Sequence, residues 1–201
     1  KVANSKGAIT IAMTGFMNTE MAHNGQYVVI YSNGNNQVYS KANQALALKL
    51  GFEILYQFEH YENYKAAIEA YSKIDGIIAD ARHRLLSKAK EFADTFKDDS
   101  VFYIVASGPL FGTAYTMACC HLMEMQRKHA IALHSGEYFH GPFETTGRDV
   151  PFILFKSTGR TRPLDERVER FIKKYNEHHI IIDAEEVGLG QLDPNQPLRH
   201  R

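Results

Sequence analysis

The sequence predicts an α/β protein in which helices cover both faces of a doubly wound parallel sheet. From residue 101 onward, short apolar runs alternate with segments in which apolar residues recur at helical spacing. Strands that alternate with helices are typical of parallel sheets. The apolar runs are nearly continuous, as expected for strands that are buried on both faces. An apolar content of 44% in 201 residues is sufficient for a packed core.

The first part of the chain predicts two strands followed by a helical connection. Residues 8–13 and 27–31 are short runs rich in β-branched residues, and we expect both to form buried parallel strands. Apolar residues then recur at helical spacing over residues 38–57. Two further, separate helices are predicted at residues 61–74 and 77–96.

A charged stretch at residues 97–100 marks a boundary, after which a second unit begins. Its order of strand, helix, strand, loop, strand, helix and strand predicts a parallel sheet covered on both faces. The expected strands are residues 101–106, 130–133, 152–155 and 179–183, and the expected helices are residues 113–127 and 164–175.

Composition argues against several classes of function. The formal net charge is zero, from 23 basic and 23 acidic residues, which predicts no binding surface for nucleic acid or anionic membranes. No apolar run approaches the length of a membrane span, and no signal peptide is recognisable. The two cysteines, Cys119 and Cys120, are adjacent and therefore poor disulfide partners. Together these features predict a cytoplasmic protein.

One stretch of the second unit holds two candidates for proton transfer. Glu124 lies near the end of an expected helix, and His140 follows sixteen residues later in a polar turn before Gly141-Pro142. Carboxylates and imidazoles are common general acids and bases. Because open α/β folds bind ligands at the carboxyl edge of the sheet, we expect both side chains to converge on one pocket there. The alternative is that both are solvated surface residues.

Ser107 and Gly108 occupy a position that suits ligand binding, because they end one strand and precede a helix. Glycine allows close approach of the backbone, and a helix N-terminus offers unpaired N–H groups to a hydroxyl or phosphate. The alternative is an ordinary turn between strand and helix. The spacing G-P-L-F-G differs from the G-x-G-x-x-G pattern of dinucleotide sites.

Several histidines raise the question of a metal site. His121, His129 and His134 lie eight and five residues apart, close to His140 in the sequence. This spacing does not match the H-x-x-x-H pair or the Cys/His clusters of zinc sites. We therefore expect no bound metal.

Two motifs resemble the sugar isomerase (SIS) domain family. The sequence G-E-Y-F-H-G-P at residues 136–142 resembles the G-E-x-x-H-G-P element of the isomerase domain of glucosamine-6-phosphate synthases and of the related fructosamine-6-phosphate deglycases. The sequence A-S-G-P-L-F-G-T-A at residues 106–114 resembles the G-S-G-x-x-x-G-T-A entry to the same domain. Residues 43–74 resemble the linker helices of the deglycases, which favours the deglycase branch.

The resemblance implies a hydrolase that cleaves a fructosamine 6-phosphate, such as 6-phosphofructosyl-lysine, into glucose 6-phosphate and an amine. It implies that His140 helps to open the sugar ring and transfers a proton, while Glu124 assists departure of the amine. Ser107, Gly108 and Glu137 would bind the substrate, although Glu137 can instead hold its own loop. No metal or organic cofactor is implied. The family typically forms dimers with sites at the subunit interface, so we expect a homodimer or a higher assembly.

The same resemblance divides the chain into three parts. Residues 1–58 correspond to part of a first SIS unit and the start of a helical connection, residues 59–98 to linker helices, and residues 99–201 to a second SIS unit with a C-terminal tail. The phosphate-binding loop S-x-S-G-x-T of SIS proteins does not occur in the sequence. We therefore expect the sequence to be a piece of a longer protein.

Two other functions remain open. One is a phosphosugar aldose–ketose isomerase, or the isomerising half of an aminotransferase. The other is a non-catalytic sugar-phosphate sensor, as in transcription regulators that carry SIS domains. A sensor has no need of both Glu124 and His140 and would add a helix-turn-helix domain, whereas a synthase would add a glutamine amidotransferase domain.

Overall fold

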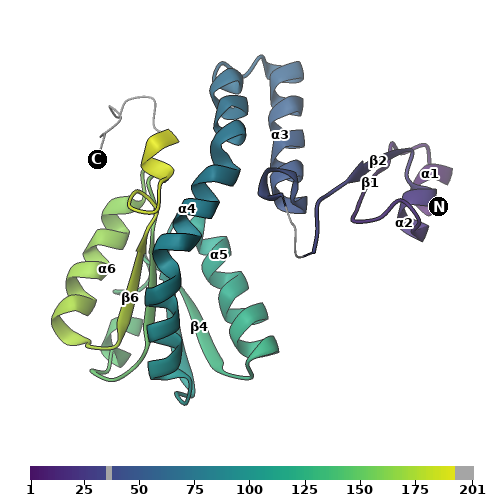
Figure 1. Cartoon of the computed structure of the whole chain (residues 1–201). Helices are drawn as coiled ribbons and strands as arrows, with labels where there is room; N and C mark the ends of the chain where they lie inside the picture. Colours follow the sequence, from purple (N-terminus) through teal and green to yellow (C-terminus); the bar gives the residue numbers. More distant parts are fainter. Residues whose placement is uncertain (35–37, 193–201) are drawn as a thin grey trace. The chain divides into compact units, whose positions relative to one another are not determined.

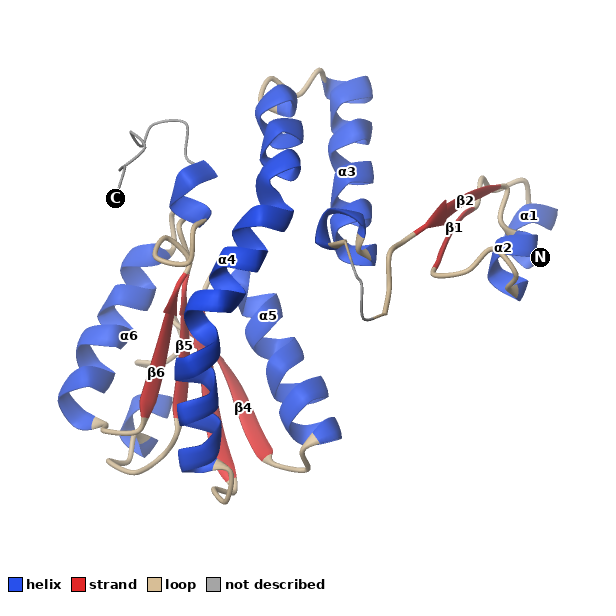
Figure 2. Ribbon diagram, in the orientation of Figure 1, coloured by secondary structure: helices blue, strands red, loops and turns tan. Residues whose placement is uncertain are grey.

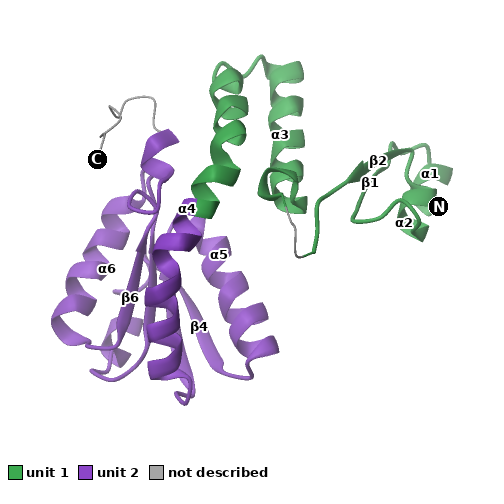
Figure 3. Ribbon diagram, in the orientation of Figure 1, with its two compact units in different colours: residues 1–79 green, residues 80–201 purple. Residues whose placement is uncertain are grey.

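The computed structural model describes residues 1–34 and 38–192, so the expected C-terminal tail lies outside the described residues from residue 193 onward. The chain forms two compact units, Lys1–Ala79 and Asp80–Arg201 (Figure 3). The boundary between them lies within one helix.

The first unit begins with a small two-stranded sheet. Strand β1 pairs in parallel with β2, with Ile11 opposite Tyr27, so the expected parallel pairing is confirmed. The expectation that both strands are buried is wrong for β2, in which no residue is buried. Helix α2 packs against β1, where Ala12 and Ala22 are buried, whereas Tyr27 of β2 remains 63% exposed. The elements are α1 Val2–Ser5, β1 Ile11–Thr14, α2 Glu20–Asn24 and β2 Tyr27–Ile30.

Two helices complete the first unit and lead into the second. After the short 3-10 helix η1 (Tyr39–Lys41), α3 runs from Asn43 to Glu59 and α4 from Tyr64 to Phe96. The expectation of two separate helices between residues 61 and 96 is therefore wrong. Gly76 lies between the two expected helices, but an isolated glycine inside a helix costs only about 1 kcal/mol. The preceding Asp75 carboxylate accepts hydrogen bonds from the Ser40 backbone N–H and hydroxyl, which ties α4 to the segment before α3.

The second unit is built on a four-stranded parallel sheet with the order β4-β3-β5-β6 (Figure 2). The predicted parallel sheet is confirmed, and β3 and β6 have the predicted limits. The strand order changes direction between β3 and β5, which is the type of position at which open α/β sheets bind ligands. The strands are β3 Val101–Ala106, β4 His129–His134, β5 Phe152–Lys156 and β6 His179–Asp183.

Side chains alternate between the two faces of this sheet, and each face has its own core. Phe102 and Ile104 of β3 pack on the first face, together with residues of α4 and of the helix that follows β3. Tyr103 and Val105 pack on the second face against α6 and the segment that connects β4 to β5. Helices therefore cover both faces, as predicted for a doubly wound sheet (Figure 1).

The helix after β3 differs from the expected regular helix over residues 113–127. It begins earlier, as α5 (Leu110–Thr116), and continues as a π-helix, η2 (Met117–Met125). Such wide helical turns are rare overall, but those that occur often lie at functional sites. The other helices of this unit are η3 Pro142–Thr145, α6 Arg162–Tyr175 and η4 Leu189–Leu192.

Candidate functional site

The carboxyl edge of the sheet holds a buried polar cluster. Ser107, which follows β3, is fully buried and its hydroxyl donates to the Thr161 backbone carbonyl at 3.2 Å. Gly108 adopts a φ of 53°, and a Cβ atom there would lie 2.6 Å from the Thr161 Oγ1 atom. The glycine is therefore needed for the approach of Thr161. In this conformation Ser107 is buried beside Thr161, whereas Gly108 remains partly exposed.

A second part of this cluster surrounds Asp165, whose side chain is fully buried in the first turn of α6. Its Oδ1 accepts a hydrogen bond from the Ser135 hydroxyl at 2.6 Å. Its Oδ2 accepts from the Ser157 backbone N–H at 2.9 Å and from the Ser157 hydroxyl at 3.0 Å. One carboxylate thus links the carboxyl ends of β4 and β5 to the N-terminus of α6.

Glu124 lies in the last turn of the π-helix η2, five residues before β4 begins at His129. Its side chain is exposed. The N–H of Lys128 donates to the carbonyl of Leu122, which closes the turn between the π-helix and the strand. Glu124 is therefore placed near the amino end of β4, far from the carboxyl edge at which it was expected.

His140 lies in the turn that follows β4, and its side chain is exposed. The backbone N–H of His140 donates to the carbonyl of Glu137, and Gly141 beyond it adopts a φ of 131°, which residues other than glycine rarely adopt. The Glu137 side chain is exposed, and no described group donates a hydrogen bond to its carboxylate. The alternative role of Glu137, in holding its own loop, therefore gains no support.

The loop of His140 crosses the second face of the sheet. Because β3 lies between β4 and β5, the chain must cross β3 to reach the start of β5. It does so with Tyr138, which is fully buried, and with Phe139 and Phe143, all packed in the core of the second face. The helix of Glu124 packs on the first face, where Ala118 and Leu122 contact the core.

Glu124 and His140 are therefore carried by elements on opposite faces of the sheet. No hydrogen bond or ion pair joins the two side chains in the described part of the chain. The expectation that one chain brings both residues into a single pocket is not met. The difference arises because a crossing connection, rather than a compact turn at the sheet edge, follows β4.

The histidines show no arrangement that suggests a metal site. Within residues 1–34 and 38–192, no group of three or more His, Cys, Asp or Glu residues could hold a metal ion. His134 instead contacts its own loop, where its Nδ1 accepts the N–H of Gly136 at 3.1 Å.

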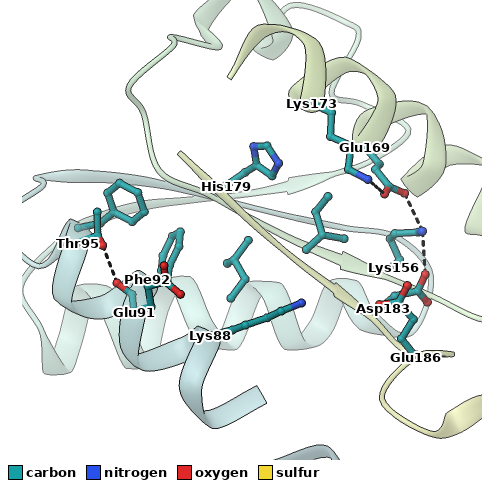
Figure 4. Close-up of a pocket in the computed structure, with 13 residues that line it drawn as sticks. Lys88, Glu91, Phe92, Thr95, Lys156, Glu169, Lys173, His179, Asp183 and Glu186 are labelled. Atoms are coloured by element: carbon teal, nitrogen blue, oxygen red, sulfur yellow. Dashed lines mark hydrogen bonds and ion pairs between the residues drawn. The ribbon is translucent and has the colours of Figure 1, made fainter. Parts of the chain in front are cut away.

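A pocket with a volume of about 530 Å³ lies along β6, between α4 and α6 (Figure 4). Lys156 and Asp183 end the neighbouring strands β5 and β6 and are direct partners in the sheet register. The Lys156 Nζ lies 2.8 Å from the Asp183 carboxylate and 2.7 Å from Glu169 on α6. Arg162 donates two hydrogen bonds to Asp183, at 2.8 and 2.7 Å.

The charges of this ion network stabilise one another. Burial alone would raise the pKa of Asp183, but hydrogen bonds from Arg162 and Lys156 outweigh it and hold the pKa far below its ordinary value. Burial likewise opposes the charge on Lys156, yet its pKa is raised because Asp183 and Glu169 accept its hydrogen bonds. Sequence reasoning missed this network. The available signal was a charged residue directly after each of two apolar strands.

Comparison with known proteins finds relatives of this chain. The chain is 37% identical to the fructosamine deglycase FrlB of Bacillus subtilis (strain 168) over 191 residues, which is 95% of this chain and 58% of that protein. It is 31% identical over 103 residues to the fructoselysine 6-phosphate deglycase of Escherichia coli (strain K12), which is 51% of this chain and 30% of that protein. No family model matches the chain.

Comparison with solved structures also finds similar proteins. A crystal structure of a candidate phosphosugar isomerase from Salmonella typhimurium LT2 superposes with a TM-score of 0.90 at 38% identity and covers 96% of this chain. The chain therefore has the fold of sugar isomerase (SIS) structures. The SIS fold is also shared with the C-terminal domain of a glucosamine-fructose-6-phosphate aminotransferase from Francisella tularensis, with a TM-score of 0.72 at 13% identity over 90% of this chain and 53% of that one.

These relatives are longer than this chain. It spans 58% of the Bacillus subtilis protein and 61% of the Salmonella typhimurium structure. No helix in residues 1–34 and 38–192 has the length and apolar character needed to cross a lipid bilayer.

Proposed function

We propose that this protein is a fructosamine-6-phosphate deglycase, which hydrolyses a substrate such as 6-phosphofructosyl-lysine to glucose 6-phosphate and the free amine. The observation that carries the proposal is the 37% identity to a fructosamine deglycase along 95% of the chain. The matched region includes nearly all of the second unit, in which Glu124 and His140 lie. We place this activity in the cytoplasm.

Each active site is formed by residues from two copies of the chain. Glu124 and His140 of one chain lie on elements that pack on opposite faces of the sheet. Both side chains are exposed, and a second copy can therefore supply the missing partner of each. In a symmetric dimer, each of two equivalent sites would receive Glu124 from one chain and His140 from the other.

In this site, His140 opens the sugar ring and moves a proton at C1 of the substrate. C1 and the amine nitrogen each lose a proton while C2 and its oxygen each gain one, which converts the fructosamine to an imine with a double bond between C1 and the nitrogen. Glu124 guides a water molecule to C1 and then protonates the nitrogen as the C1–N bond breaks. One water molecule is consumed, and glucose 6-phosphate and the amine are released. An imidazole and a carboxylate can share such acid and base steps near neutral pH.

The substrate contacts follow from the same arrangement. Glu137 is exposed in the loop of His140, and its carboxylate can accept hydrogen bonds from sugar hydroxyls. Ser107 would contact the substrate only if Thr161 moves away, since Ser107 is buried beside Thr161 in this conformation, whereas Gly108 is partly exposed.

A second candidate is a phosphosugar isomerase, which the Salmonella typhimurium structure favours. An isomerase would use the same proton shift at C1 and C2 but would leave the C1 substituent in place. The two functions differ in the product that they release.

The test is a direct assay of the full-length gene product with 6-phosphofructosyl-lysine. We expect glucose 6-phosphate and lysine to appear in equal amounts, measured by coupled reduction of NADP and by amine analysis. Interconversion of glucose 6-phosphate and fructose 6-phosphate without any release of lysine would instead identify an isomerase.

A further inference from the structure

The loop that carries His140 begins at Ser135, where the chain leaves β4. Ser135 is 1% exposed, its N–H donates to the Ala106 carbonyl, and its hydroxyl donates to Asp165. The turn is then closed by the Glu137 N–H, which donates to the His134 carbonyl, and by the His140 N–H, which donates to Glu137. The buried carboxylate therefore holds Ser135, and the backbone and hydrogen bonds of the turn that includes Ser135 lead from there to His140.

The far side of this loop is fixed to the same helix by aromatic contacts. The Phe171 ring of α6 makes edge contacts with Tyr138 at 5.9 Å and with Phe139 at 5.6 Å between ring centroids. The guanidinium of Arg167 lies over the Phe139 ring at 3.9 Å. Contacts with α6 thus hold the two residues that precede His140. The His140 side chain itself is exposed.

From these contacts we infer that Asp165 is a positioning residue for the proposed reaction. It acts through the Ser135 hydroxyl to fix the start of the His140 loop, and so sets the place at which the imidazole meets the substrate. A buried carboxylate that accepts three hydrogen bonds holds its donors strongly, because charge-assisted bonds are about twice as strong as neutral ones. Misplacement of an acid–base group by about 1 Å can cost on the order of 100-fold in rate. The catalytic part of this inference rests on the proposed deglycase function.

The chain supplies a matched pair of variants for the test. Ser135 and Ser157 are both nearly fully buried, and both hydroxyls donate to Asp165. Only Ser135 leads into the His140 loop, since Ser157 lies at the end of β5. Ser135→Ala and Ser157→Ala therefore each remove a hydroxyl donor from the same carboxylate but differ in what that bond holds, and Ser157→Ala also removes a hydrogen bond with the Thr161 hydroxyl at 3.2 Å.

The first measurement is amide hydrogen exchange of the loop, which requires no activity. We expect Ser135→Ala to speed exchange at residues 136–141 by about fivefold, because the loss of one buried hydrogen bond is worth roughly 1 kcal/mol of local stability. Ser157→Ala should leave exchange in these residues unchanged. Equal exchange of the loop in the two variants would overturn the inference.

The second measurement separates the inference from the proposed function. In the full-length gene product, Ser135→Ala should lower kcat at least tenfold with little change in KM, and Ser157→Ala should retain kcat. An unchanged kcat in Ser135→Ala, while His140→Asn abolishes turnover, would overturn the positioning role alone. If His140→Asn itself retains turnover, the proposed role of His140 and the catalytic part of the inference both fail, whereas the proposed function fails only if the parent protein releases no lysine. The anchoring of the loop is then decided by hydrogen exchange.

Discussion

Substitution of Glu124 by Gln and of His140 by Asn is expected to lower deglycase turnover by about 10²–10⁴-fold each, the usual contribution of a general acid or base. Both side chains are exposed, so neither change empties a core site or leaves a buried group without a partner. The melting temperature should therefore change little. The assay is release of glucose 6-phosphate from 6-phosphofructosyl-lysine by the full-length gene product.

The control for this experiment is Glu144→Gln. Glu144 is an exposed carboxylate close to His140 in the chain, within η3, and we assign it no chemical role. Its variant should retain turnover. A loss of less than tenfold in both Glu124→Gln and His140→Asn would show that these residues do not carry the proton transfers.

The second large effect concerns stability. Replacing Asp183 with Asn should destabilise the protein by about 3 kcal/mol at pH 7, because removal of one partner from a buried ion pair leaves uncompensated charge. Lys156 and Arg162 both lose their shared partner, and the Asp183 side chain is only 5% exposed. Urea unfolding of the variant and the parent at pH 7 measures this difference.

The pH dependence of this effect has a definite sign. The pKa of Asp183 is lowered in the folded protein, so its contribution is fully present above the pKa of an unfolded aspartate, about 3.9. It is lost as the pH falls further toward the folded pKa. The stability difference between the parent and Asp183→Asn should therefore shrink below about pH 4. The control is Glu177→Gln, which breaks the exposed ion pair with Arg148 and should have little effect at either pH.

Much of the second unit could be predicted from the sequence because its strands are apolar on both faces. The limits of β3 and β6 were predicted correctly, since continuous runs such as V-F-Y-I-V-A end at polar residues. The unbroken course of α4 could not be predicted. Gly76 is a weak helix former, but the bonds from Ser40 to the neighbouring Asp75 depend on a segment 35 residues away.

The candidate site could be predicted less well than the fold. A π-helix has a wider turn than the regular spacing used to predict helices, so η2 was not visible in the apolar pattern. The placement of His140 depends on Tyr138 and its aromatic neighbours, which carry the connection across the sheet. Nothing in the spacing of Glu124 and His140 indicates on which face of the sheet each residue lies.

The central claim is that one site takes Glu124 from one chain and His140 from a second. It is tested most directly by mixing the two inactive variants, Glu124→Gln and His140→Asn, under conditions in which subunits exchange. In a mixed dimer one site receives both native residues and the other receives neither. Because half of the randomly formed dimers are mixed, we expect activity to recover to about one quarter of the parent value. Mixing Glu124→Gln with the double variant, as a control, should restore nothing. Activity that stays at the level of the separate variants, although mass spectrometry shows mixed dimers, would contradict a site shared between two chains.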